Sequence, residues 1–299
     1  MHHLKFPKLD DVAKPSRQEF RPSLTMLGWG LNEEQNVRDY IERAEALLAK
    51  YTDDFEVILF DDGSTDRTWE IAEECRKTRP WLRVVKNSEN RGPAYCIRCG
   101  FPMVTKQFVF WQTCDWAYDV ELLLANLGSL KKFDILQGVR LGSLSIAGMA
   151  KSRSDNFRKG VISAVNYWLV RLLFRLPLSD YQNVTIYPAR WAQSLKLQSS
   201  SSFANPELLL KSWWKGAAIR EVPVSFVKRT HGTGKGTSCR RIVHSLGSIV
   251  YWWFQWIVLR NREDFRSGTV LRWTETSASS ALPPKFSGPA KAQISRRAA

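Results

Sequence analysis

Two adjacent aspartates followed by a glycine are the residues most suggestive of chemistry in this sequence. Asp61, Asp62 and Gly63 follow residues 57–60, an apolar run with the β-branched bias of a buried strand. In open α/β sheets ligands bind at the carboxyl ends of strands, where carboxylates can accept hydrogen bonds from base imino and ribose hydroxyl groups. The alternative is a simple turn and helix cap, because Asp and Gly are common in both.

A third acid follows another apolar run. Asp115 comes just after residues 108–111, which we predict to be a strand. A hard divalent cation needs oxygen ligands and often takes only one or two protein carboxylates together with diphosphate oxygens. Acids at two strand ends therefore predict a nucleotide and metal site. The alternative for Asp115, and for Asp119, is the preference of acids for a helix N-terminus.

Charge is divided unevenly along the 299 residues. Residues 1–130 hold 17 Lys and Arg against 21 Asp and Glu, whereas residues 131–299 hold 27 against 8. A basic half predicts an anionic partner such as a phosphate group or an acidic lipid headgroup. A nucleic acid partner is not expected, because no recognition motif is present and the acidic strand ends would oppose a phosphate backbone.

Alternating patterns predict the elements that position these residues. We expect an α/β fold with a mostly parallel sheet flanked by helices. The expected strands cover residues 24–27, 55–60, 82–85, 108–111, 135–139, 184–187 and 219–224. The expected helices begin near Asn32 and residue 66 and cover residues 91–104, 119–130, 162–173 and 206–214. Residues 142–156 and 230–238 are small, polar and basic, as loops often are.

The order of the motifs resembles family 2 glycosyltransferases, and within them the dolichol- or polyprenyl-phosphate sugar transferases. The resemblance covers roughly residues 22–240. Its segments are residues 24–36 (LTMLGWGLNEEQN), residues 60–68 (FDDGSTDRT), Asn90-Arg91-Gly92, Thr113-Cys114-Asp115, and Glu221-Val222-Pro223-Val224 followed by Arg229-x-x-Gly-x-Gly-Lys235.

The resemblance implies a GT-A (Rossmann-like) fold and an inverting transfer from a nucleoside diphosphate sugar to a polyprenyl phosphate, with Mg²⁺ or Mn²⁺. It implies that Asp115 holds the metal and that Arg229 and Lys235 act on the diphosphate. It places the acceptor phosphate at Arg140 and Arg158. The implied nucleotide-binding residues are Asn32, Glu33, Glu34, Asp61, Asp62, Gly63, Arg91 and Gly92.

Three positions depart from the family pattern. Thr113 stands in place of the first acid of the DXD motif, Trp29 in place of a proline, and Ala117 in place of a Gln or Ser. One oxygen ligand of the metal is therefore lost or supplied by water, and Asp119 is a candidate substitute. The alternatives are a transferase with another glycan or glycolipid acceptor, and a non-catalytic member that binds nucleotide. His231, inside the glycine-bearing loop, fits a loop residue better than a catalytic base.

The ends of the chain are predicted to have separate roles. Residues 1–22 form an N-terminal arm, residues 23–240 the transferase domain, and residues 265–299 a disordered basic tail. Residues 241–264 are predicted to be an amphipathic interfacial helix, because residues 246–259 are apolar, rich in aromatics and flanked by Arg, yet shorter than the roughly 20 residues needed to span a bilayer. The alternative is a core helix.

The remaining expectations concern the compartment. The five cysteines fit no secreted disulfide pattern, and Cys96-x-x-Cys99 has no further metal ligands at suitable spacing, so free thiols are favoured. The polar N-terminus does not fit a secretion signal. We therefore expect a cytoplasmic protein attached peripherally to the cytoplasmic face of an anionic membrane, where a membrane-embedded partner could join it.

Overall fold

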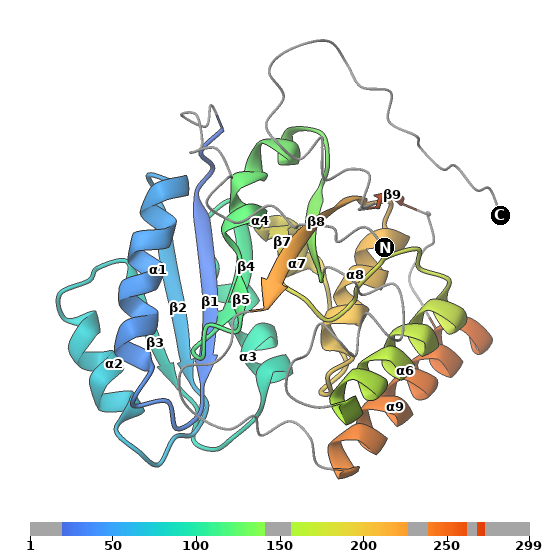
Figure 1. Cartoon of the computed structure of the whole chain (residues 1–299), viewed down its shortest axis with the longest axis horizontal. Coiled ribbons are helices and arrows are strands. Elements are labelled where there is room, and N and C mark those ends of the chain that lie inside the picture. Colours follow the sequence, from blue (N-terminus) through green and yellow to red (C-terminus); the bar gives the residue numbers. More distant parts are fainter. Residues whose placement is uncertain (1–19, 141–156, 227–238, 262–267, 273–299) are drawn as a thin grey trace, which may run out of the picture.

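A computed structural model describes residues 20–140, 157–226, 239–261 and 268–272 (Figure 1). Its sheet has the strand order β3-β2-β1-β4-β7-β6-β8-β5, with β9 paired to β8. Helices flank this sheet, so the predicted α/β class is confirmed. None of the described helices combines the length and apolar character needed to cross a membrane.

The first half of the sheet is parallel. Its strands are β1 (Leu24–Gly30), β2 (Phe55–Asp61), β3 (Leu82–Lys86) and β4 (Phe108–Thr113). They are joined by α1 (Val37–Tyr51), α2 (Thr68–Arg76), and α3 (Pro93–Gly100) with a 3₁₀ turn at Phe101–Met103. Strands β1, β2 and β4 are almost completely buried because both faces carry apolar side chains, as is usual for parallel sheets covered by helices, whereas the edge strand β3 is partly exposed.

The second half is mixed. Strands β5 (Tyr118–Asp119), β6 (Ile135–Arg140), β7 (Thr185–Pro188), β8 (Ala218–Phe226) and β9 (Thr269–Leu271) complete the sheet. Pairs β4–β7, β6–β7 and β5–β8 are antiparallel, whereas β6–β8 and β8–β9 are parallel. The helical segments of this half are α4 (Glu121–Ala125), a 3₁₀ turn (Leu127–Lys131), α6 (Phe157–Phe174), α7 (Ala189–Ser194), α8 (Ala204–Trp214), α9 (Cys239–Trp253) and a π-helical turn (Phe254–Val258).

Three sequence predictions of elements need correction. The first helix begins at Val37 rather than near Asn32, because Asn32 has a positive φ of 53° that no helix accepts. The single helix predicted for residues 119–130 is a short strand, one helical turn and a 3₁₀ turn. The predicted disordered tail is wrong at β9, which adds a strand to β8.

The C-terminal helix has two different faces. Ser245, Ile249 and Trp256 are buried, and the ring of Trp256 contacts those of Phe174 and Trp214. The side chains on the opposite face are exposed. The helix thus packs on the core, as the alternative interpretation required, while its attachment to a membrane stays a prediction.

Candidate functional site

The carboxyl ends of β1, β2 and β4 form one edge that brings the predicted site residues together. The parallel register pairs Gly30 with Asp61 and Trp29 with Thr113. Strand β1 lies between β2 and β4. The chain passes from β1 to β2 on one side and later returns from β3 to β4 on the other side of β1. Such a topological switch point is where open α/β sheets bind ligands. The register therefore places the end of β2, which carries Asp61, and the end of β4, which precedes Asp115, at the same edge of the sheet.

Asp61 offers a free hydrogen-bond acceptor at this edge. The residue is 1% exposed, and its Oδ1 accepts a hydrogen bond of 3.0 Å from the backbone N–H of Ser64. Its Oδ2 is buried and has no hydrogen-bond partner within the described part of the chain. Buried polar atoms are nearly always satisfied in native proteins, so an unpartnered carboxylate oxygen points to a ligand that donates to it.

Asp62, in contrast, organises the neighbouring loop. Its Oδ1 accepts hydrogen bonds from Asn87 Nδ2 (2.8 Å) and the backbone N–H of Arg91 (2.9 Å), and its Oδ2 accepts one from the N–H of Gly92 (2.8 Å). Because the carboxylate is 4% exposed and already holds three donors, it positions residues 87–92. Arg91 and Gly92 are therefore joined to the site through their backbone.

Gly63 lets this loop approach. Its φ is +79°, and a Cβ at this position would lie 2.5 Å from the carbonyl carbon of Glu89. A side chain would therefore be strained by the backbone conformation and would also clash with backbone. The glycine of the Asp-Asp-Gly run is therefore required for packing between the two loops.

The loop after β1 is tied to the loop after β2. The N–H of Asn32 donates to Ser64 Oγ (2.9 Å), and Asn32 Oδ1 accepts a hydrogen bond from the N–H of Thr65 (2.9 Å). Glu34 Oε2 accepts a hydrogen bond from the N–H of Arg67 (3.2 Å). The side chains of Asn32 and Glu34, predicted to bind nucleotide, thus hold the walls of the edge together.

Three carboxylates surround Cys114. Burial raises the pKa of the Cys114 thiol well above its usual range, and the charges of Glu33, Asp115 and Asp61 raise it further. The hydroxyl of Thr113 donates a hydrogen bond to Asp115 Oδ1, so the residue that replaces the first DXD acid is bound to the second. The carboxylates of Glu33, Asp61 and Asp115 therefore give this edge of the sheet a negative potential, and the hydroxyl of Thr113 lies beside Asp115.

Oxygen donors of this kind suit a hard divalent cation. In the described residues no group of three or more His, Cys, Asp or Glu side chains could hold a metal ion by itself. The carboxylates at this edge still fit Mg²⁺ or Mn²⁺ bound by one or two of them, since Mg²⁺ usually keeps several waters and substrate phosphate oxygens as ligands. Asp115 would hold the ion, which would neutralise charge on a diphosphate.

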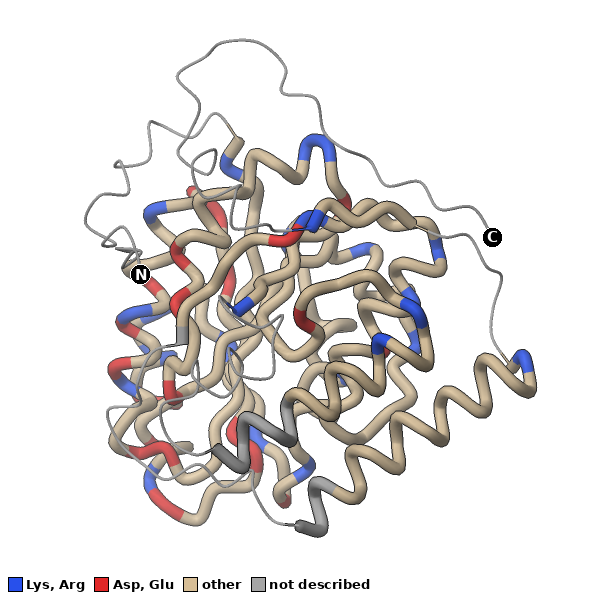
Figure 2. Tube along the Cα trace, turned by 45° about the vertical axis from the view of Figure 1, so that its right-hand side comes forward, with Lys and Arg blue, Asp and Glu red and all other residues tan. Residues whose placement is uncertain are grey.

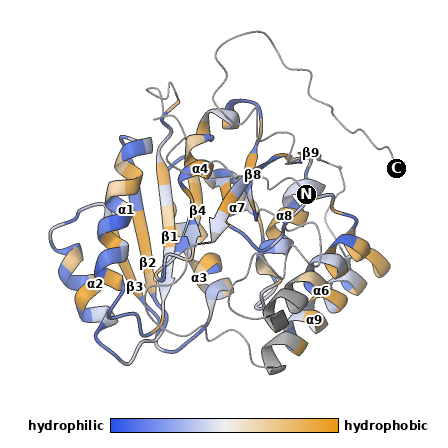
Figure 3. Cartoon of the chain, viewed as in Figure 1, coloured by the Kyte–Doolittle hydropathy of each residue, from blue (hydrophilic) through white to orange (hydrophobic). Residues whose placement is uncertain are grey.

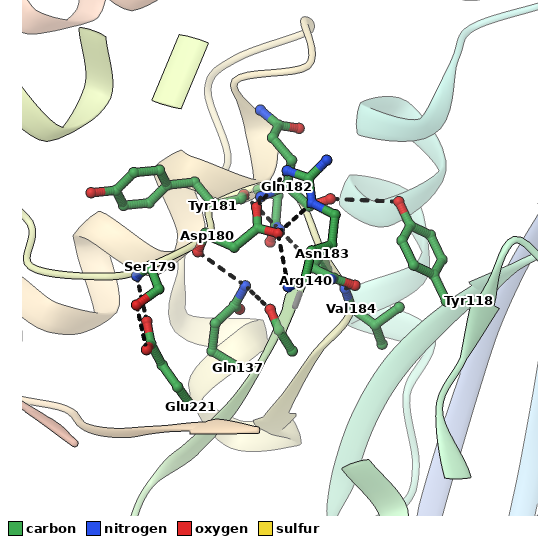
Figure 4. A network of polar contacts seen from close by, with 12 residues as sticks. Tyr118, Gln137, Arg140, Ser179, Asp180, Tyr181, Gln182, Asn183, Val184 and Glu221 are labelled. Carbon is green, nitrogen blue, oxygen red and sulfur yellow. Dashed lines mark hydrogen bonds and ion pairs between the residues drawn. The ribbon is translucent and has the colours of Figure 1, made fainter. Parts of the chain in front are cut away.

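Arg140 lies at the end of β6 in a buried ion pair (Figure 4). Its Nε and Nη2 donate to the two carboxylate oxygens of Asp180 at 2.6 and 2.9 Å, and its side chain is 7% exposed. Burial alone would raise the pKa of Asp180, but the guanidinium of Arg140 lowers it. The predicted role of Arg140 in direct phosphate binding does not agree with this geometry, because a buried carboxylate already occupies the guanidinium.

A second carboxylate lies in the same network. Glu221, from the Glu-Val-Pro-Val motif on β8, accepts hydrogen bonds from the N–H and hydroxyl of Ser179. Arg272, just after β9, lies 3.4 Å from Ser179 Oγ. The motif residue thus fixes the segment that precedes β7 and presents Asp180.

Four of the singled-out residues cannot be placed. Arg229, Lys235 and His231 lie outside the described residues, and Arg158 is in the first turn of α6 with a side chain that is not described. The described cysteines are free thiols, of which Cys75, Cys96 and Cys114 are buried and Cys99 is half-buried.

Sequence reasoning missed two residues. Asn87 follows β3 directly, so its position just after a strand was a usable signal for the edge. Asp180 follows no predicted strand, and its partner is 40 residues away in the chain. No local pattern could have paired them.

Comparisons with known proteins identify sugar transferases that act on lipid phosphates as relatives of this chain. The chain is 26% identical to the dodecaprenyl-phosphate galacturonate synthase of Rhizobium johnstonii, over 74% of this chain and 64% of that protein. It is 24% identical to the dolichol-phosphate mannosyltransferase of Mycosarcoma maydis, over 83% of this chain and 82% of that protein. A third relative, the undecaprenyl-phosphate 4-deoxy-4-formamido-L-arabinose transferase of Pseudomonas fluorescens, is 24% identical over 71% of this chain and 59% of its own length. The chain therefore spans about 60% of the length of two of these three relatives.

The fold has a counterpart among solved structures. The mannosyltransferase PcManGT of Pyrobaculum calidifontis, in complex with GDP-Man and Mn²⁺, superposes with a TM-score of 0.54 at 15% identity, over 82% of this chain and 66% of that one. At this identity the likeness concerns the fold, and it confirms the GT-A architecture. The family model described as Glycosyl transferase family 2 matches residues 31–187, which include Asp61, Asp62 and Asp115. The chain therefore belongs to glycosyl transferase family 2, as its motifs predicted.

Proposed function

We propose that this chain transfers a sugar from a nucleoside diphosphate sugar to a polyprenyl phosphate, with inversion at the anomeric carbon, at the surface of a membrane. The observation that carries the proposal is the buried, unpartnered Oδ2 of Asp61, which lies at the same sheet edge as Glu33 and Asp115. The relatives named as polyprenyl- and dolichol-phosphate sugar transferases support the acceptor class.

The donor would lie across the carboxyl ends of β1, β2 and β4. Asp61 Oδ2 would accept a hydrogen bond from the base or ribose, and Asp62 would keep the 87–92 loop against the nucleotide. Asp115 would hold Mg²⁺ or Mn²⁺ at the diphosphate. The cation would lower the electrostatic repulsion between the acidic edge and the donor.

The acceptor supplies its own nucleophile. A phosphate oxyanion of the polyprenyl phosphate attacks the anomeric carbon, the bond from that carbon to the diphosphate oxygen breaks, and a nucleoside diphosphate leaves. Little base catalysis is needed, so positioning and electrostatic stabilisation must supply most of the rate. Arg158, Arg229 and Lys235 are the proposed cations for the acceptor phosphate and the diphosphate.

We place the reaction on the cytoplasmic face of a membrane, where the chain would be attached peripherally and could meet a membrane-embedded partner. The basic second half of the sequence supports an anionic surface there.

A non-catalytic nucleotide-binding role is the second candidate. It is favoured by Thr113, which replaces the first acid of the DXD motif. Thr113 donates a hydrogen bond to Asp115 and supplies no second carboxylate for a metal. Both candidates require nucleotide binding at Asp61, and only the first requires turnover.

A nucleotide-sugar panel tests the proposal. Uridine and guanosine diphosphate sugars are added to the full chain with and without Mn²⁺, and the midpoint of thermal unfolding is measured. A bound donor at 100 times its Kd should stabilise the chain by about 2.7 kcal/mol. Transfer of the stabilising sugar to a polyprenyl phosphate supports the enzyme, stabilisation without transfer supports the second candidate, and no stabilisation contradicts both.

Acceptor binding is tested with a charge-matched pair. Arg158→Ala should raise the KM for polyprenyl phosphate more than the KM for the donor, whereas Arg190→Ala, an exposed position on α7, should change neither. An equal change in both KM values for Arg158→Ala would argue against its role at the acceptor phosphate.

A further inference from the structure

Large exposed apolar side chains are confined to one region of the described chain. Nine large apolar side chains are strongly exposed there, and all lie on α6 or on α9 and the turn that follows it. Single exposed apolar residues are ordinary, but a gathered group on a soluble surface indicates a binding face.

On α6 the exposed residues form one stripe. Val165, Trp168 and Leu172 recur at spacings of three and four residues, and Leu172 is 68% exposed. The opposite side of this helix is buried through Tyr167 and Phe174. Helix α6 therefore carries apolar side chains both on its buried side and on its outward side.

A second stripe lies on α9. Val243, Val250 and Phe254 follow one another at spacings of seven and four residues, and Val243 is 69% exposed. Tyr251 is 54% exposed and lies beside Val250 in the sequence. Trp256, in the π-helical turn, is buried in the core. The helical segment is therefore packed on the core although the stripe on its other face is exposed.

The two helices run side by side. They pack against each other and point in the same direction at the outer edge of the molecule (Figures 1 and 2). Both carry orange, apolar segments in Figure 3. Helix α6 begins directly after residues 141–156, and α9 directly after residues 227–238, which contain His231 and Lys235.

Charge indicates the kind of partner. Residues 157–175 and 239–261 contain seven Lys or Arg and no Asp or Glu. Arg175 and Arg260 are both exposed, Arg175 directly after α6 and Arg260 two residues after the π-helical turn. Apolar stripes with aromatic residues and terminal arginines match the boundary between acyl chains and anionic headgroups, where aromatics and Arg are favoured.

We infer that the exposed stripes of α6 and α9 together form a docking surface for an anionic lipid bilayer, and that α6 contributes to it as much as the C-terminal helix does. This surface would hold the transferase close to a lipid-linked phosphate. The inference rests on the proposed function for that purpose, but lipid binding itself requires no turnover.

The apolar part is tested by flotation of the full chain with phosphatidylcholine vesicles, with and without phosphatidylglycerol. The double variant Leu172→Gln/Val250→Gln should weaken binding about tenfold or more, because each residue loses apolar area in the bilayer. The control Ala46→Gln/Ala49→Gln places the same side chains on the exposed face of α1 and should bind as the unaltered chain does.

The ionic part has its own pair of variants. Arg175→Gln/Arg260→Gln should weaken binding to the anionic vesicles roughly tenfold and leave binding to neutral vesicles unchanged. The control Arg38→Gln/Lys77→Gln removes the same charge from another exposed region and should have a much smaller effect.

Three results would overturn the surface. They are no flotation of the unaltered chain, equal flotation with both kinds of vesicle, and equal binding by Leu172→Gln/Val250→Gln and its control. If the unaltered chain does not bind vesicles but forms a dimer that Leu172→Gln/Val250→Gln dissociates, the surface binds a second copy of this chain instead of a bilayer. Nucleotide-sugar stabilisation, measured on the same samples, separates the two proposals: its loss with intact flotation contradicts the function only, and the reverse contradicts the surface only.

Discussion

The carboxylates of Asp61 and Asp62 are adjacent in the chain but have opposite hydrogen-bonding states. Asp61 Oδ2 is buried without a partner in the described structure, whereas both oxygens of Asp62 accept hydrogen bonds from the 87–92 loop. The first residue is therefore available to a ligand, and the second holds the loop that would border it.

Asparagine substitutions should separate these two roles. Asp62→Asn should lower the free energy of unfolding by about 2 kcal/mol. The reason is that the side-chain NH₂ group, a donor, would face a backbone N–H group, which is also a donor. Asp61→Asn should leave stability equal or higher while weakening nucleotide-sugar binding by roughly tenfold or more. Chemical unfolding and donor titration measure both, and a stable Asp62→Asn with normal binding would contradict the assignment.

Metal dependence should follow Asp115. Asp115→Asn should abolish Mn²⁺-stimulated transfer while changing the free energy of unfolding by less than about 1 kcal/mol. Asp119→Asn serves as the control, since Asp119 Oδ1 accepts the N–H of Glu121 and an amide oxygen can do the same. Transfer that stays Mn²⁺-dependent in Asp115→Asn would move the metal elsewhere, and loss in Asp119→Asn would identify the substitute ligand.

The ion pair between Arg140 and Asp180 should show strong coupling. Arg140→Met or Asp180→Asn alone should cost about 3–5 kcal/mol of stability, since each leaves a buried group without its counter-charge. The double variant should recover much of this loss. Unfolding free energies of all four proteins give the coupling. A single Arg140→Met variant that stays fully stable but loses only acceptor affinity would restore the phosphate-binding prediction.

Stability at low pH should depend on Asp66. Partial burial would raise its pKa, but hydrogen bonds from the hydroxyl and N–H of Thr68 and from the N–H of Glu34 outweigh burial and lower the pKa below 3.8. A lowered folded-state pKa stabilises the fold above the unfolded value, and this contribution is lost as pH falls through the folded value.

Asp66→Asn should therefore be less stable than the unaltered chain by about 1 kcal/mol at neutral pH, with the difference shrinking below roughly pH 4. Unfolding by urea at several pH values measures this. Glu42→Gln on the exposed face of α1 should show no such dependence. A difference that stays constant with pH would show that the carboxylate charge of Asp66 contributes nothing.

The sequence by itself determined seven of the nine strands, which excludes β5 and β9, as well as the acidic strand ends and the family. Residues 57–60 and 108–111 are apolar runs whose character is local, so the strands and the acids that follow them could be predicted without tertiary information. The division of charge between the two halves was equally readable. These features depend on neighbours within a few positions.

Only the tertiary structure decided which of these residues are available to a ligand. Asp62 and Arg140 form their hydrogen bonds and ion pair with partners 25 to 40 positions away. Which face of α6 is exposed depends on where the helix packs. Hydrogen-bond saturation and burial depend on such distant contacts, which no local pattern specifies. The sequence therefore predicted where the site lies, and the packing of separate segments determined which atoms remain free within it.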